Sequence, residues 1–150
     1  MASNRYINRE LSWIKFNERV LWQASNRRSP ILERVKFAAI FESNFDEFFM
    51  VRVSGLIEQE EAEIEETSPD GLTPSQQLDL IAQEATALRE KALEVYQGSL
   101  IPSLRRAGVR LAKWGDIDPP AKQVLSSYFE AEIFPICTPL ALHPCPTFPF

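Results

Sequence analysis

The first hundred residues carry apolar side chains at intervals of three and four positions, which is the period of amphipathic α-helices. The pattern predicts helices over about residues 8–24, 30–42, 45–66 and 74–106. We expect their apolar faces to pack together, so the predicted fold class of this part is an all-α helical bundle. The predicted core contains Leu11, Trp13, Phe16, Leu32, Val35, Phe45, Phe48, Phe49, Leu78, Ile81 and Leu88. Asn17 lies among aromatic residues, and we expect it to hydrogen-bond to a neighbouring backbone group or helix end.

Several of these helices carry start and stop signals. Ser29 followed by Pro30 is expected to cap and open the second helix. Residues 73–76 (TPSQ) have the spacing of a capping box, with proline at the first helical position. Pro102 should end or kink the last helix, and Gly108 fits a C-cap after two arginines.

A polar pair, Ser43 and Asn44, interrupts the broad apolar face of the stretch 37–55. Short polar side chains prefer helix caps and turns, and both residues stand at capping-box spacing from an acidic residue. One helix is therefore expected to end near Glu42 and another to begin near Phe45. Such a break would leave free backbone N–H groups beside Asn44, which suit a phosphate or another polar ligand group. From spacing alone, a cap without a ligand is the favoured role.

Residues 58–95 separate into an acidic run and an apolar seam. Six glutamates in the run 58–66 form a solvated face, and that helix end should fray before a turn at 67–72. The seam consists of Leu78, Ile81, Ala85, Leu88, Ala92 and Val95. It could pack against the preceding helix as a long antiparallel hairpin, or form an intermolecular coiled coil. Because the seam is short and contains two alanines, packing within the chain is favoured.

The pattern changes after the last of these helices. Residues 109–114 are a candidate edge strand, and Asp118 followed by two prolines opens a further helix. The buried face expected for that helix consists of Val124, Leu125, Tyr128, Phe129 and Ile133. Five prolines after Phe134 exclude a regular helix and favour extended geometry. We therefore expect a helical N-terminal domain over 1–107 and the truncated start of an α+β domain over 108–150.

The composition narrows the class of protein. An apolar fraction of 45% is ordinary for a globular chain. Residues 1–57 hold nine Lys/Arg against six Asp/Glu, whereas residues 58–150 hold seven against fifteen, so an anionic ligand suits the first part better. No dense basic patch with interleaved aromatics indicates nucleic-acid binding. No signal peptide or membrane-spanning run is present, and two cysteines give no disulfide framework, which favours the cytoplasm.

The sequence contains no group to which we assign a catalytic role. It has no GxxxxGK[ST] loop, and its five glycines form no other convincing phosphate loop. The single histidine, His143, lies in the proline-rich tail and is not assigned the role of a phosphoryl-accepting nucleophile. Cys137, His143 and Cys145 have poor spacing for a metal site and no fourth ligand follows, so no metal ligand is predicted.

Several segments carry a resemblance to one protein family. They are Asn8 to Leu21 (NRELSWIKFNERVL), Ile31 to Ile40 (ILERVKFAAI) and Phe37 to Gly55 (FAAIFESNFDEFFMVRVSG). In this order they resemble the N-terminal domain of the long-chain polyphosphate kinase family, the ATP:polyphosphate phosphotransferases. A further segment, Phe134 to Phe150, is similar to the start of that family's next domain, the head domain. The resemblance reaches both ends of the chain but covers only the beginning of a much longer enzyme.

The resemblance implies an activity and a site. The family transfers the terminal phosphate of ATP reversibly to polyphosphate through a phosphohistidine, on C-terminal domains that this chain lacks. In its motif N-x-D-E-F-F the asparagine, here Asn44, is an ATP-binding position. Arg52 could assist by charge or stacking, although pairing with Asp46 or Glu42 is an equal alternative. ATP, ADP and polyphosphate are the implied ligands, and Mg²⁺ is expected in the parent enzyme with ligands outside this chain.

Two functions from different classes remain open. One is the nucleotide-covering domain of a polyphosphate kinase, inactive as an isolated fragment. The other is a helical interaction or dimerisation module without a ligand of its own, using the seam at 78–95 and the acidic run as partner surfaces. A homo-oligomer is compatible with either function, and peripheral association with a membrane is not readable from the sequence.

Overall fold

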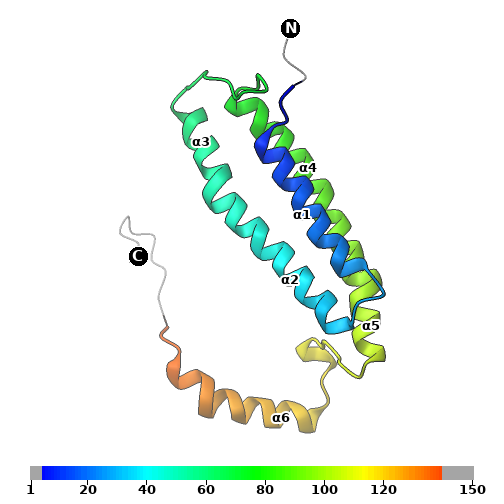
Figure 1. Ribbon diagram of the computed structural model, residues 1–150. Helices are drawn as coiled ribbons and strands as arrows, with labels where there is room; N and C mark the ends of the chain where they lie inside the picture. The colour runs from blue at the N-terminus through cyan, green and yellow to red at the C-terminus, as the bar shows by residue number, and fades with distance from the viewer. Residues whose placement is uncertain (1–4, 140–150) are drawn as a thin grey trace. The chain divides into compact units, whose positions relative to one another are not determined.

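The computed structural model describes residues 5–139, which fall into two compact units divided between Arg110 and Leu111. In the first unit, residues 5–110 form a bundle of three long helical stretches (Figure 1). The first is α1 (Arg9–Ser25). The second joins α2 (Ile31–Glu47), the π-helical segment η1 (Phe48–Val53) and α3 (Ser54–Glu61); the third joins α4 (Pro74–Val95), the π-helical segment η2 (Tyr96–Leu100) and α5 (Ile101–Arg106). The expected all-α bundle is confirmed.

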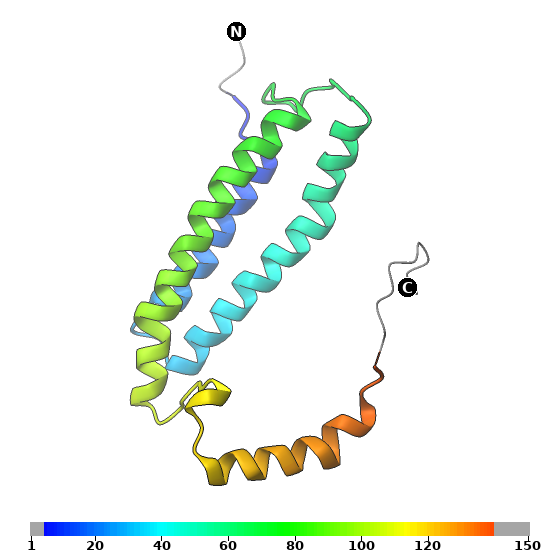
Figure 2. The same cartoon turned by 180° about the vertical axis from the view of Figure 1, so that it is seen from behind.

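The helices α1 and α4 run in the same direction, and the α2–α3 stretch runs antiparallel to both (Figures 1 and 2). Two ion pairs join α1 to α4: Lys15 with Glu84 and Lys91 with Glu18, each at 2.7 Å. The hydrogen bond to Glu84 raises the pKa of Lys15, and the hydrogen bond from Lys91 lowers the pKa of Glu18. Because both pairs are largely exposed, they fix the register of the two helices more than they stabilise the fold.

In the first unit one predicted start signal is confirmed, another is wrong by one residue, and a cap at Asn8 is new. Thr73 forms a capping box at the start of α4, with proline at the first helical positions. Asn8 caps α1, since its Oδ1 accepts the backbone N–H groups of the second and third helical residues at 3.0 and 3.1 Å. At α2, Pro30 rather than Ser29 holds the N-cap position. The backbone N–H of Ser29 instead closes a turn onto the Asn26 carbonyl.

The stop signal at Gly108 is also confirmed. Gly108 has φ +84°, and its N–H donates to the Arg105 carbonyl while the next N–H donates to the Leu104 carbonyl. A left-handed residue with these two hydrogen bonds closes the carbonyl end of α5. The glutamate-rich helix ends earlier than its sequence pattern, at Glu61, and the chain turns there through Glu63 at φ 52°.

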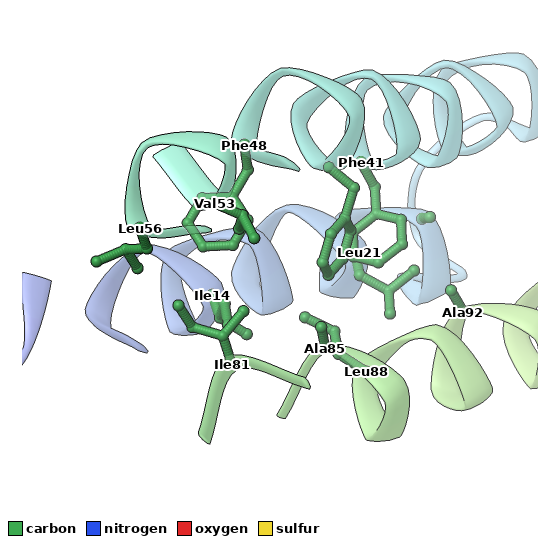
Figure 3. Close-up of a cluster of buried hydrophobic side chains, with 12 residues drawn as sticks. Ile14, Leu21, Phe41, Phe48, Val53, Leu56, Ile81, Ala85, Leu88 and Ala92 are labelled. Atoms are coloured by element: carbon green, nitrogen blue, oxygen red, sulfur yellow. The ribbon is translucent and has the colours of Figure 1, made fainter. Parts of the chain in front are cut away.

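The core lies between the three stretches (Figure 3). Its buried members are Ile14, Leu21, Ala24, Phe41, Phe45, Phe48, Val53, Leu56, Ile81, Ala85, Leu88 and Ala92. Leu11, Trp13, Leu78 and Val95 pack against this cluster and are partly buried. The seam of α4 therefore packs within the chain, as its length and composition favoured.

The expected helix break at Ser43 and Asn44 does not form. α2 continues to Glu47 and passes through η1 into α3 without a terminus. The carbonyl of Asn44 accepts the backbone N–H of Phe48, so the helical ladder is intact at this point. The hypothesis of free N–H groups beside Asn44 is wrong, because the packing of Phe41, Phe45 and Phe48 outweighs the local preference of two polar residues for a cap.

Three residues of the predicted core are on the surface. Phe16, Leu32 and Phe49 have 46%, 66% and 38% of their surface exposed. A helix in a three-stretch bundle has an outward side that neither neighbour covers, and the apolar arcs of α1 and α2 are wider than the covered part. Val35 is half-buried. Periodicity therefore identified which helices face the core but overestimated the width of their buried faces.

The second unit, residues 111–139 as described, is a short series of helices. It contains η3 (Trp114–Asp116), α6 (Pro119–Tyr128), η4 (Phe129–Ile133) and η5 (Phe134–Ile136). The helix after Asp118 is confirmed, but its apolar face is exposed, with Val124 at 69% and Tyr128 at 57%, because no other element of this unit covers it among the described residues. The expected edge strand does not form: residues 109–113 are irregular and pair with no strand within 5–139. Over the same range, no helix has the length and apolar content needed to cross a bilayer.

Two phenylalanines separated by four positions should differ sharply in their effect on stability. Phe45 is 1% exposed, whereas Phe49 is 38% exposed and contacts the Phe45 and Phe48 rings from outside. Phe45→Ala should lower the free energy of unfolding by roughly 3–5 kcal/mol, because it leaves a cavity in the core. Phe49→Ala should lower it by only about 1–2 kcal/mol, from partial loss of buried area. Urea unfolding of both variants measures the difference, and equal losses would contradict the assigned burial.

Candidate functional site

Asn44 lies in the last turn of α2, where the helix continues into η1, and turns its side chain towards α1. Its Nδ2 donates to Asn17 Oδ1 at 3.0 Å, and the residue is half-buried. Asn17 is fully buried, and its own Nδ2 donates to the Phe41 carbonyl at 3.1 Å. The expected bond from Asn17 to a neighbouring backbone group is confirmed. The two asparagines thus form a short hydrogen-bonded chain between α1 and α2.

This chain fixes which way each amide points. A backbone carbonyl only accepts, so the atom of Asn17 that faces Phe41 must be its NH₂ group. The Oδ1 of Asn17 must then face Asn44, and only the NH₂ group of Asn44 can donate to it. Asn44 keeps its Oδ1 and one remaining N–H for other partners, and among residues 5–139 no group donates to that Oδ1. The side chain therefore keeps one acceptor and one donor for a ligand.

Aromatic rings hold the two asparagines in place. Trp13 of α1 stacks on Phe48 with ring centroids 4.3 Å apart and planes 4° apart, and it meets Phe45 edge-on at 6.2 Å. Phe41 meets Phe45 edge-on at 5.1 Å. Asn17 is fully buried, and a hydrogen bond shielded from water is stronger than an exposed one. The pair is therefore a rigid feature of the α1–α2 interface.

The outer side of Asn44 is more open. Ile40, one helical turn before Asn44, has 37% of its surface exposed. Phe16, the residue before Asn17, is 46% exposed, and the Arg19 guanidinium lies 5.8 Å from its ring centroid. An amide edge flanked by exposed apolar groups suits a flat ligand that is apolar on its faces and polar on its rim.

Arg52 lies in η1 and has a partner that the sequence did not indicate. Its Nη1 is 3.3 Å from Glu10 Oε2, and the other oxygen of Glu10 is 2.7 Å from Arg9. The expectation of pairing with Asp46 or Glu42 is wrong. Glu42 is 3.6 Å from Arg89 of α4 instead. The wider turn of the π-helical segment changes the direction of the side chains after Phe48, and this directs Arg52 towards α1.

Glu10 is the site residue that sequence reasoning missed. It is 4% exposed, although it is a carboxylate in the first turn of α1. One signal could have found it: Glu10 precedes Ile14 by four positions and so lies on the apolar face of its helix. A carboxylate at such a position needs a cation, and Arg52 supplies it.

A cavity of about 890 Å³ opens where the start of α1, the η1–α3 stretch and the loop before α4 meet. Asn8, Glu10, Arg52, Asp70 and Gln77 contribute its polar lining. Within this lining, Asn8 Nδ2 donates to Gln77 Oε1 at 2.9 Å and to Asp70 Oδ1 at 3.4 Å. Arg52 lines this cavity and Asn44 does not, so the structure does not bring the two predicted site residues into one pocket.

No metal ligand and no catalytic histidine were predicted for this chain. Within residues 5–139, no group of three or more His, Cys, Asp or Glu side chains is placed to hold a metal ion. Cys137 is exposed, while His143 and Cys145 lie outside the described residues.

Comparison with known proteins identifies the family. A family model described as the polyphosphate kinase N-terminal domain matches residues 6–112. The chain belongs to the polyphosphate kinase family. Polyphosphate kinases of Mycobacterium tuberculosis strain H37Rv and Mycobacterium marinum are 45% and 43% identical to it over all 150 residues. The resemblance inferred from the sequence segments is confirmed.

A solved polyphosphate kinase structure supports the same assignment. The crystal structure of polyphosphate kinase from Porphyromonas gingivalis superimposes with a TM-score of 0.72 at 31% identity and covers 95% of this chain. The chain spans about a fifth of the length of these polyphosphate kinases, 20% in each case. It corresponds to their N-terminal domain and the residues that follow it.

Arg52 should be tested first as a structural partner of Glu10. Arg52→Gln removes the cation beside a buried carboxylate and should lower the free energy of unfolding by about 1–2 kcal/mol, less than for a fully buried pair because Arg52 is 37% exposed. Arg9→Gln removes the other cation beside Glu10, but Arg9 is 83% exposed and the loss should stay below about 1 kcal/mol. Urea unfolding gives both values. If Arg52→Gln unfolds at the same urea concentration as the unchanged chain, Arg52 does not stabilise the fold through Glu10.

Proposed function

We propose that this chain is the N-terminal, nucleotide-facing domain of an ATP:polyphosphate phosphotransferase, and that Asn44 contacts the nucleotide. Membership of the polyphosphate kinase family supports the activity of the whole enzyme. The observation that carries the role of Asn44 is its hydrogen bonding: Asn17 takes one N–H of the half-buried amide and leaves one acceptor and one donor without a partner among residues 5–139.

The orientation favours the base of ATP over its phosphates as the contact. Phosphate oxygens at neutral pH only accept hydrogen bonds, so a phosphate would use the free N–H of Asn44 and leave its Oδ1 without a donor. The rim of adenine places an amino donor beside a ring-nitrogen acceptor, and an asparagine amide matches both groups at once. Ile40, one helical turn before Asn44, and Phe16, the chain neighbour of Asn17, are exposed apolar side chains that suit the faces of a purine. Asn44 would then hydrogen-bond to the adenine base and would not contact the transferred phosphate.

The chemistry of phosphoryl transfer belongs elsewhere in the enzyme. We assign no catalytic residue to this chain and propose that transfer through a phosphohistidine, with any Mg²⁺ it needs, uses groups outside it. We retain the proposed domains 1–107 and 108–150, which the division of the fold between Arg110 and Leu111 supports. The cytoplasm remains the proposed compartment, supported by the absence of a disulfide framework in the sequence.

The alternative function, an interaction module, required the seam at 78–95 to be available to a partner. Ile81, Ala85, Leu88 and Ala92 of the α4 seam are buried against the other helices of the same chain. A partner could reach them only by opening the bundle. The acidic run at 58–66 remains exposed, but a run of glutamates is by itself a solvated surface and not a partner site.

The role of Asn44 can be tested in the full-length enzyme. Asn44→Ala should raise KM for ATP roughly threefold to tenfold, the loss of one neutral hydrogen bond or two weak ones. Ser43→Ala changes the adjacent exposed residue of α2 and should leave KM unchanged, so it is the matched control. A base contact also predicts that Asn44→Ala narrows the preference for ATP over GTP.

Asn44→Asp distinguishes the base from the phosphates. The aspartate keeps an outward acceptor but cannot donate to Asn17, and it adds a negative charge. If phosphate lies near, KM for ATP should rise further than in Asn44→Ala; if only the base is near, the two variants should be similar. Melting temperatures of each variant separate loss of binding from loss of stability. An unchanged KM in both variants would end the proposal that Asn44 contacts ATP.

A further inference from the structure

The end of the bundle opposite the cavity is rich in unpaired arginines. There the α1–α2 connection, the start of α2 and the η2–α5 stretch lie together (Figures 1 and 2). This end carries Arg27, Arg28, Arg34, Arg105 and Arg106. Within residues 5–139, no carboxylate lies within ion-pair distance of any of these five side chains. The ion pairs of the bundle lie along its sides and at its other end.

Arg34 is the buried member of this group. It is 4% exposed; its Nε donates to the Ala24 carbonyl at 2.8 Å and its Nη2 donates to Ser99 Oγ at 2.7 Å. These acceptors satisfy hydrogen bonds but carry no formal charge. The carbonyl end of α1 contributes only a partial negative charge. A buried cation normally has an anionic partner, and here none is present among the described residues.

The neighbours of Arg34 add positive charge. Burial lowers the pKa of Arg34, and the charges of Arg27 and Arg106 lower it further, although a guanidinium keeps its proton in proteins. Arg27 and Arg106 are exposed and lie close enough to Arg34 for their charges to act on it, and Arg106 bonds to Ser103, one turn after the Ser99 that bonds to Arg34. The three charges repel one another in the unliganded chain, and an anion placed between them would relieve that repulsion.

Two serines extend the group along one side of η2 and α5. Ser99 and Ser103 are four positions apart, and Arg106 follows three positions later. Ser99 Oγ accepts from Arg34, and Ser103 Oγ accepts from Arg106 Nη2 at 2.9 Å. Each hydroxyl that accepts from a guanidinium keeps its own hydrogen to donate. The site therefore combines guanidinium and hydroxyl donors, which suits an oxyanion.

We infer that this end of the bundle binds a condensed phosphate, with Arg34 at the base of the site and Arg27 and Arg106 at its sides. Guanidinium groups match phosphate oxygens in geometry as well as charge. Three fixed positive charges exceed the charge of one orthophosphate and fit two or more linked phosphates. The identity of the anion rests on the proposed function, whereas the site itself rests on the uncompensated arginines.

The inference is tested by titrating this chain with tripolyphosphate and measuring the affinity by calorimetry. Tripolyphosphate has no base, so the result does not depend on Asn44, and Asn44→Ala should bind it unchanged. Arg27→Gln and Arg106→Gln alter exposed side chains and should each weaken binding roughly threefold to fivefold, with roughly tenfold or more for the double variant. Arg9→Gln removes the same charge from the opposite end and should have no effect. Binding should also weaken as salt is added.

Four results would overturn the inference. The first is the absence of saturable binding, and the second is unchanged binding by the Arg27/Arg106 double variant. The third is equal affinity for orthophosphate, which would show a simple anion site. The fourth is equal or tighter binding of a peptide of glutamates with the same charge, which would assign this surface to an acidic protein segment. If tripolyphosphate binds as expected while Asn44 variants leave KM for ATP unchanged, the arginine site stands and the nucleotide contact falls.

Discussion

The interface between α1 and α2 depends on one buried amide, that of Asn17. It is fully enclosed, so each of its polar atoms must find a partner inside the protein, and it finds them on two different turns of α2. Because both bonds are directional, they allow one register between the helices, which the aromatic packing of Trp13 and Phe48 alone would not demand. The same two bonds hold Asn44 in one orientation. The need to satisfy the buried amide of Asn17 therefore also orients Asn44 for the proposed nucleotide contact.

The two ends of the bundle handle buried charge differently. At the cavity end, Glu10 is enclosed but faces Arg52 and Arg9, so its negative charge is balanced within the chain. At the other end, Arg34 is enclosed beside carbonyl and hydroxyl oxygens only, and the nearest charges are positive. The charge of Glu10 therefore needs no ligand to balance it, and this arrangement serves the fold alone. The second leaves a positive potential that a ligand or another part of the enzyme can use.

Local signals in the sequence were reliable where the interaction is local. The capping box at Thr73 and the left-handed cap at Gly108 involve atoms a few residues apart, so the side chains present are sufficient to form them. The same kind of signal at Ser43 and Asn44 was misleading, because phenylalanines on α2 gain more from continuous packing than two polar residues gain from a cap. The burial of Phe16 and Phe49 was overestimated for a related reason: periodicity gives the direction of an apolar face but not the number of neighbours that cover it.

The sequence by itself determined the helical class, the order and approximate ends of the long helices, the packing seam of α4 and, through its motif segments, the family. These properties depend on short-range periodicity, on caps, and on similarity along the chain. Only the tertiary structure decided that Asn44 bonds to Asn17, that Arg52 pairs with Glu10, and that Arg34 is buried without a carboxylate. The bonds Asn44–Asn17, Arg52–Glu10 and Arg34–Ser99 each join residues more than twenty positions apart. Their partners are set by the rotation of each helix about its axis and by the π-helical segments that shift it, and neither is encoded in a local pattern.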